Sequence, residues 1–126
     1  IAQATLKQLL ASGVQRVGLL GTIYTMKESF YKETLQKGGV SVLIPSAEDM
    51  RMINDVIFKE LCLGKISPDS KRDFLRVIDK MADAGAQGAI LGCTEIGMLV
   101  SQADTDVRLF DTTQIHIDEA VELALS

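Results

Sequence analysis

The residues best suited to chemistry are Gly92-Cys93-Thr94-Glu95, which directly follow the apolar run from Ala86 to Leu91. A thiol followed by a hydroxyl and a carboxylate at the end of a buried strand is suited to moving protons. Ligands of open α/β sheets bind outside the carboxyl ends of the strands, and a helix that begins there can stabilise a thiolate. Cys93 is therefore a candidate catalytic residue, although most free cysteines are small buried core residues.

The elements that must position this motif follow from the alternation of apolar runs and amphipathic stretches. We expect strands at residues 16–20, 40–44, 88–91 and 107–110, with helices before, between and after them. Strands that alternate with helices predict a parallel sheet covered on both faces. The predicted fold class is α/β: residues 1–126 form a single lobe with a four-stranded parallel sheet flanked by helices, in a flavodoxin-like three-layer arrangement.

In such a sheet the loops at 21–25, 45–46, 92–95 and 111–113 meet at one edge. Each loop leads into a helix, and the N–H groups of a helix N-terminus favour an anion. The hydroxyls that can add donors, and so predict a carboxylate or phosphate site, belong to Thr22, Thr25, Thr94 and Thr112. Each threonine alone can instead be a helix cap; Thr25 and Glu28 have the spacing of a capping box.

Other known sites fit this edge less well. Residues 21–25 lack the lysine of a Walker A loop and the spaced glycines of a dinucleotide site. His116 is the only histidine, and its place shortly after the last strand would allow it to reach Cys93 as in a hydrolase triad. A solvated or satisfied histidine on the last helix is the simpler interpretation.

Composition limits the classes of function. The chain has 126 residues, of which 47% are hydrophobic and 24% charged, and a formal charge of −4. No basic stripe suited to nucleic acid is visible, and the apolar runs are too short for a membrane span. Cys62 and Cys93 lack metal-ligand spacing, so we expect no metal, no disulfide, and reduced thiols in the cytoplasm.

Three motifs together resemble the aspartate/glutamate racemase superfamily. They are Gly92-Cys93-Thr94-Glu95, Gly18-Leu19-Leu20-Gly21-Thr22 followed by Thr25-Met26, and Phe110-Asp111-Thr112-Thr113 leading into Ile115-His116. The resemblance covers essentially the whole chain and is to the second, C-terminal lobe of an aspartate racemase-like amino-acid racemase. It implies racemisation of a small amino-acid substrate without a cofactor, with two cysteines facing each other across the α-carbon.

The resemblance also implies roles for individual residues. Cys93 is one of the two acid/base thiols, and Thr94 with its N–H holds the α-carboxylate. Glu95 orients the amine or the thiol, unless it is only a carboxylate suited to a first helical turn. Thr22 and Thr25 belong to the substrate loop.

Two departures from the family qualify this interpretation. The partner cysteine belongs to a missing N-terminal lobe, and Cys62 is expected to lie away from the site, so the chain alone should be inactive. A lysine of aspartate-specific members aligns with Cys62, while Lys65 is slightly displaced, which leaves the substrate open. Because Ile1 opens inside a helical pattern without an N-cap, we expect a piece of a longer polypeptide, which self-associates as a homodimer.

Two alternatives remain. One is a decarboxylase or isomerase of the same superfamily that uses Cys93 without a matching thiol. The other is a non-catalytic α/β module that binds an anion at the threonine-rich edge. The latter predicts an ordinary pKa for Cys93 and ligand binding that survives its alkylation.

Overall fold

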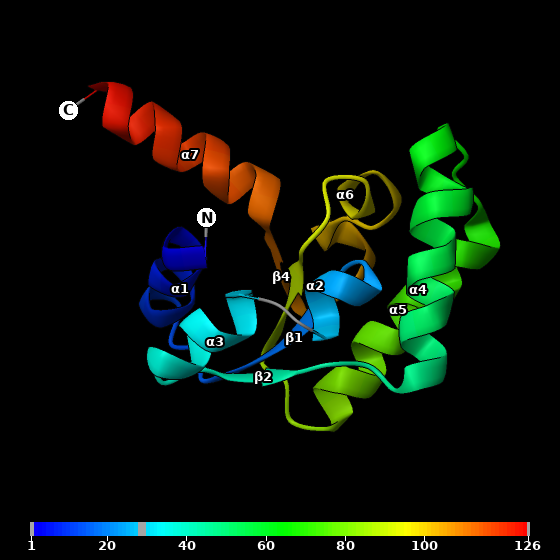
Figure 1. Cartoon of the computed structure of the whole chain (residues 1–126), viewed down its shortest axis with the longest axis horizontal. Coiled ribbons are helices and arrows are strands. Elements are labelled where there is room, and N and C mark those ends of the chain that lie inside the picture. Colours follow the sequence, from blue (N-terminus) through cyan, green and yellow to red (C-terminus); the bar gives the residue numbers. More distant parts are fainter. Residues whose placement is uncertain (1, 28–29, 126) are drawn as a thin grey trace.

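A computed structural model describes residues 2–27 and 30–125 (Figure 1). The strands are β1 (Arg16–Leu20), β2 (Ser41–Leu43), β3 (Gly88–Leu91) and β4 (Arg108–Asp111). The α-helices are α1 (Ala2–Ala11), α2 (Ile23–Lys27), α3 (Phe30–Lys37), α4 (Ala47–Lys59), α5 (Pro68–Asp83), α6 (Ile96–Leu99) and α7 (Thr112–Leu125). Two short 3₁₀ helices are η1 (Leu61–Leu63) and η2 (Gln102–Asp104). The four predicted strands are confirmed to within one residue at each end.

The sheet is parallel throughout, with the strand order β2-β1-β3-β4. This confirms the predicted α/β class. The second strand of the chain lies on one side of β1 and the third strand lies on the other side. The carboxyl ends of β1 and β3 therefore flank the switch point of the sheet, where ligands of such folds bind.

Helices cover both faces of the sheet, with α1 and α3 on one side and α4 and α5 on the other (Figure 1). Successive residues of β1 and β3 alternate between the two cores: Leu19 and Ile90 face α1 and α3, whereas Leu20 and Leu91 face α4 and α5. Strands buried on both faces are expected to be apolar at nearly every position. The confirmed three-layer arrangement follows from that pattern.

A buried carboxylate joins α4 to α5. Asp49, whose side chain is 9% exposed, accepts hydrogen bonds from Arg76 Nη2 at 3.1 Å and from Lys80 Nζ at 3.2 Å. Burial opposes ionisation of Asp49, but the two cations outweigh it and lower the pKa of this carboxyl. The two helices on this face are therefore held together by charge as well as by apolar packing.

The last helix, α7, leaves the body of the molecule. It begins directly at the end of β4, and Figure 1 shows it projecting away from the sheet. Only Thr112 and Ile115, in its first turns, are buried. Beyond its first turns α7 is at least partly exposed, and it contacts α1 along one side.

Candidate active site

The end of β3 lies directly against the end of β1. The Gly92 N–H donates a 2.7 Å hydrogen bond to the carbonyl oxygen of Leu20. A Cβ atom on Gly92 would lie 2.9 Å from that oxygen, so any side chain there would push the strands apart. Glycine thus permits the approach that places Cys93 at the switch point.

Cys93 forms a close pair with Glu95. Its Sγ atom donates a 2.7 Å hydrogen bond to Glu95 Oε2. Burial, followed by the hydrogen bond to Glu95 and the charge of that residue, raises the pKa of the Cys93 thiol to about 11. The hydrogen bond from Cys93 lowers the pKa of the Glu95 carboxyl. At neutral pH the pair is a thiol and a carboxylate, so Cys93 can donate a proton.

Further donors surround this pair. The backbone N–H of Glu95 lowers the pKa of both Cys93 and Glu95, because it stabilises negative charge on either group. The hydroxyl of Thr94 also lowers the pKa of Glu95. A negative charge that moves between sulfur and carboxylate would therefore meet hydrogen-bond donors in both positions.

Thr22 and Thr25 lie beside this loop, at the end of β1. Their hydroxyl oxygens are 3.1 Å apart, and the Thr25 N–H donates to Thr22 Oγ1 at 3.3 Å. Thr22, not Thr25, therefore caps the helix, which begins at Ile23; the predicted capping box with Glu28 lies outside the described residues. The Thr25 methyl group would lie 3.3 Å from a Cβ on Gly92, which places it next to the Cys93 loop.

A cavity of about 440 Å³ opens beside Cys93, a size common for small-molecule pockets. Its polar wall comes from the loop after β3, from α3 and from α7, and consists of Cys93, Thr94, Tyr31, Thr112, Thr113 and His116. The predicted residues Thr22, Thr25 and Glu95 do not line it. The structure thus brings Cys93 and Thr94 into one cavity, with Glu95 behind the sulfur and the two threonines of the β1 loop alongside.

The cavity wall contains two residues, His116 and Tyr31, that the sequence did not assign to the site. His116 is exposed on α7, as expected of a solvated helix histidine, and it also lines the cavity with Cys93, which its place after the last strand allowed. Tyr31 was not predicted, because its aromatic ring fits the apolar stripe of α3. A signal was available: a helix that follows β1 begins near the carboxyl edge of the sheet, so hydroxyls in its first turn can face a ligand there.

The start of α7 does not offer the free donors that the sequence predicts. Thr112 donates its hydroxyl hydrogen to the carbonyl oxygen of Leu91 at 2.9 Å. Asp111 Oδ1 accepts the N–H groups of Thr113 and Gln114 at 2.9 and 3.4 Å. Asp111 is therefore the helix cap, and the hydroxyl hydrogen that Thr112 was expected to offer to a ligand is bound to the backbone instead.

Cys62 lies outside the cavity, as expected. It is exposed in η1 and does not line the cavity wall. Lys65, just beyond η1, is exposed and is not part of the cavity wall.

Two other kinds of site are absent from residues 2–27 and 30–125. No group of three or more His, Cys, Asp or Glu side chains there could hold a metal ion. Among the helices of this part of the chain, none is long and apolar enough to cross a membrane.

Residues 1–120 match the family model for Asp/Glu/hydantoin racemases. A candidate Asp/Glu racemase from Yersinia pestis is 45% identical with a TM-score of 0.94, and an aspartate racemase homologue from Pyrococcus horikoshii is 36% identical with a TM-score of 0.91. In both cases 99% of this chain is matched to 55% of the other. An aspartate racemase from Picrophilus torridus (21% identity, TM-score 0.68, 87% of this chain and 45% of that one) shares the fold. The chain spans about half the length of these solved structures.

Proposed function

The chain belongs to the Asp/Glu/hydantoin racemase family, and from this we propose that it is the C-terminal lobe of a cofactor-independent amino-acid racemase. The observation that carries the proposal is the pair of Cys93 and Glu95 at the switch point, beside a cavity of suitable size. A protonated thiol at this position can deliver a proton to a substrate carbon.

The proposed reaction needs one thiol on each face of the α-carbon. A thiolate from the other lobe removes the α-hydrogen as a proton, and the electron pair of the broken C–H bond spreads into the α-carboxylate. Cys93 then donates its proton to the opposite face, which forms a new C–H bond and leaves Cys93 as a thiolate. In the reverse direction the two sulfur atoms exchange roles.

The surrounding groups have distinct tasks in this scheme. The N–H and hydroxyl of Thr94 stabilise the charge that builds up on the α-carboxylate, a use typical of preorganised donors. Glu95 keeps the resting Cys93 protonated and attracts the substrate ammonium group. Thr22 and Thr25, which hydrogen-bond to each other, shape the loop on the substrate's other side.

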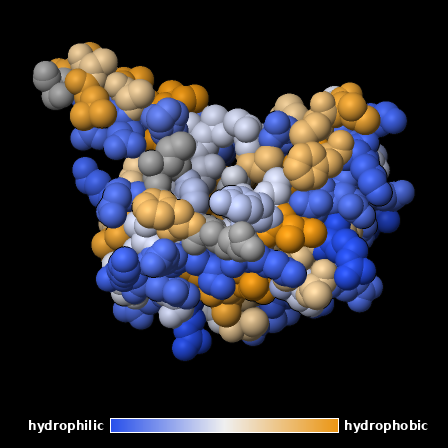
Figure 2. All heavy atoms as spheres, in the orientation of Figure 1, coloured by the Kyte–Doolittle hydropathy of each residue, from blue (hydrophilic) through white to orange (hydrophobic). Residues whose placement is uncertain are grey.

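The other lobe would cover an apolar surface around the site. Exposed apolar side chains lie at the end of α4 and near η1 (Phe58, Leu63, Ile66) and along α7 (Ile117, Val121, Leu125). Figure 2 shows the surface hollowed between the projecting α7 and the opposite corner. Apolar patches of this kind favour association. We infer that these two groups of residues contact a missing N-terminal lobe, and that without it the chain forms a homodimer and does not racemise.

The raised pKa of Cys93 also bears on the alternatives. A decarboxylase or isomerase that protonates a carbanion needs only one thiol donor, so the same pair would serve it. The non-catalytic anion-binding module predicts an ordinary pKa for Cys93, whereas burial and Glu95 raise this pKa to about 11. We further propose that the substrate is a small amino acid and that the protein, whose two cysteines are free, acts in the cytoplasm.

The test is hydrogen exchange by the protein that contains both lobes. In deuterated water it should incorporate deuterium at the α-carbon of an amino acid, and Cys93→Ser should abolish racemisation. Cys62→Ser is the matched control, since it removes a thiol outside the cavity, and it should retain activity. Racemisation undiminished by Cys93→Ser would refute the proposal; product lacking a carboxyl group would favour the decarboxylase.

A further inference from the structure

The loop that carries Thr22 and Thr25 continues into α2, a helix too short to be stable by itself. Isolated helices of fewer than about 12 residues are marginal in water, and α2 spans Ile23–Lys27. Met26 is buried on α2, whereas Tyr24 is 72% exposed. Apolar packing at Met26 fixes how deeply α2 lies but does not fix its tilt. A contact near the start of α2 is therefore needed to orient it.

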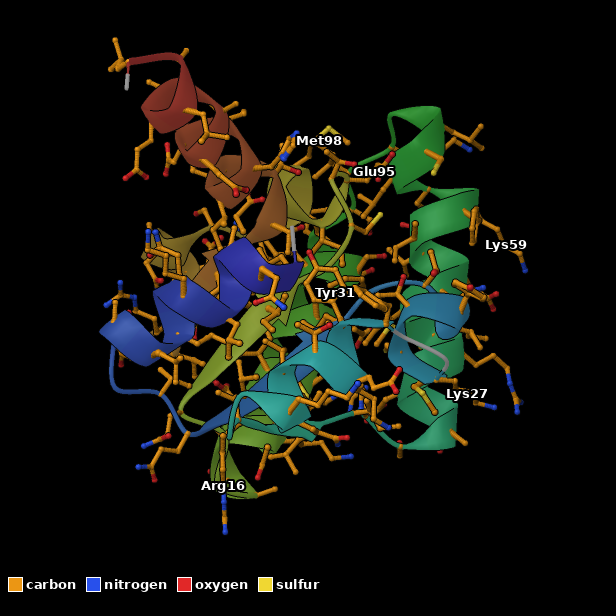
Figure 3. All side chains as sticks on the ribbon, turned by 60° about the vertical axis from the view of Figure 1, so that its left-hand side comes forward. Arg16, Lys27, Tyr31, Lys59, Glu95 and Met98 are labelled. Carbon is orange, nitrogen blue, oxygen red and sulfur yellow. The ribbon has the colours of Figure 1, made fainter. Side chains whose placement is uncertain are left out.

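Asn54 of α4 supplies such a contact. Its Oδ1 atom accepts a 2.9 Å hydrogen bond from the N–H of Ile23, the first residue of α2. The first N–H groups of a helix have no partner within that helix, and this one is bound by a side chain 31 residues further along the chain. Figure 3 shows α2, which ends at Lys27, lying against α4, which ends at Lys59. The hydrogen bond thus ties the start of α2 to a longer helix that packs on the sheet.

The place of Asn54 within α4 supports this role. Asparagine is a poorer helix former than most residues, and a half-buried amide needs a hydrogen-bond partner. Ile53 and Ile57, on the same stretch of α4, are buried in the core. Asn54 therefore stands at the border of an apolar face, where its side chain reaches the backbone of α2.

The loop held in this way packs against the strand end that leads to Cys93. The methyl group of Thr25 would lie 3.3 Å from a Cβ on Gly92. The N–H of Thr25 donates to Thr22 Oγ1 at 3.3 Å, so the two threonines and Ile23 form one turn. A displacement of the start of α2 would therefore move both threonines relative to the Cys93 loop.

We propose that Asn54 is a positioning residue, which holds Thr22 and Thr25 beside the substrate through the N–H of Ile23. The kinetic part of this inference rests on the proposed function, because that function places the two threonines at the substrate. Asn54 does not line the cavity. The pair of Cys93 and Glu95 has its own hydrogen bond, so the loss of Asn54 should weaken substrate binding and leave proton transfer nearly unchanged.

The first measurement is amide hydrogen exchange of the chain, followed by NMR. Asn54→Ala removes the acceptor, and the Ile23 amide should exchange about fivefold faster, as expected for the loss of one hydrogen bond. Alanine favours a helix, so α4 should stay folded. Asn54→Asp keeps an acceptor oxygen in place and should restore the slower rate. The matched control is Gln36→Ala, which removes an exposed amide on α3 outside the cavity and should change nothing.

The second measurement uses the protein that contains both lobes, with its fastest substrate among the common L-amino acids. Asn54→Ala should raise KM about fivefold and change kcat less than about twofold, whereas Asn54→Asp and Gln36→Ala should keep both values. An unchanged exchange rate of the Ile23 amide, or a fall in kcat at an unchanged KM, would overturn the proposal. If the unmutated protein racemises no amino acid, the proposed function fails, and the exchange rates still decide whether Asn54 holds α2.

Discussion

The Sγ atom of Cys93 lies 2.7 Å from Oε2 of Glu95, two residues further along the chain, and donates a hydrogen bond to it. This contact ties a thiol with a raised pKa to a carboxyl with a lowered pKa. The proton therefore rests on sulfur. This arrangement suits a site that must first give a proton to carbon, because the Cys93 thiol is already protonated when the substrate binds.

Replacing Glu95 by Gln should lower the pKa of Cys93, because the carboxylate raises it both by accepting the thiol proton and by its charge. At a pH below the pKa, each unit by which the pKa falls increases the fraction of Cys93 that is thiolate about tenfold. The rate of Cys93 alkylation by iodoacetamide, followed against pH in a Cys62→Ser background, reports the midpoint of Cys93 ionisation. Glu48→Gln, an exposed change on α4, is the control. An unchanged midpoint in Glu95→Gln would contradict the assigned cause.

Stability should fall at alkaline pH because of the same thiol. The folded protein holds the pKa of Cys93 at about 11, above the roughly 8.5 of a free cysteine. Its contribution to stability is therefore complete below about pH 8.5 and is lost as the pH rises toward 11. Urea unfolding of the chain and of Cys93→Ala across this range measures the effect. Parallel losses of unfolding free energy in both proteins would show that other groups cause the decline.

Gly92→Ala should destabilise the fold and displace the thiol. The new Cβ would lie 2.9 Å from the Leu20 carbonyl oxygen, which is fixed in the sheet. Overpacking of this kind costs about 1–3 kcal/mol. Gly97→Ala gives a comparison, because its Cβ would lie equally close to the movable carboxylate of Asp111. Urea unfolding should rank Gly92→Ala as the more damaging change, and the reverse order would reject the explanation.

Asp49→Asn should loosen the contact between α4 and α5. The change removes a negative charge that two cations share and that also lies in the first turn of α4. Arg76 and Lys80 are about half exposed, so solvent screens the pairs and we expect a loss of about 1–2 kcal/mol. Because the pKa of Asp49 is lowered, its contribution is present above about pH 4 and disappears in acid. Asp69→Asn, an exposed partner of Arg72, should change the unfolding free energy much less.

The apolar side of α7 should control self-association. Val121 and Leu125 are 52% and 83% exposed, and we expect Val121→Ser with Leu125→Ser to lower the average mass in light scattering toward that of a monomer. Leu10→Ser, an exposed apolar change on α1, is the control and should leave the mass unchanged. A chain that is already monomeric at high concentration would contradict the proposed homodimer.

The sheet was predictable because each strand is a short, largely apolar run that ends at a glycine, a proline or a polar residue. The place of Cys93 at the switch point follows from the end of β3 alone. The predicted helix cap at Thr25 was wrong because the helix begins earlier, at Ile23, and Thr22 Oγ1 accepts the N–H of Thr25 itself. The sequence placed His116 within reach of Cys93 but did not show that His116 and Tyr31 share a cavity wall, since this depends on how α3 and α7 fold toward one edge of the sheet.

The attachment of α7 has a further consequence. The strand ends that carry Cys93 are bonded to each other inside the sheet, whereas the helix that carries His116 is buried only in its first turns. A shift of α7 would widen or narrow the entrance without disturbing the sulfur. Substitutions in α7 of natural variants could therefore change which ligand binds, while the pair of Cys93 and Glu95 stays unchanged.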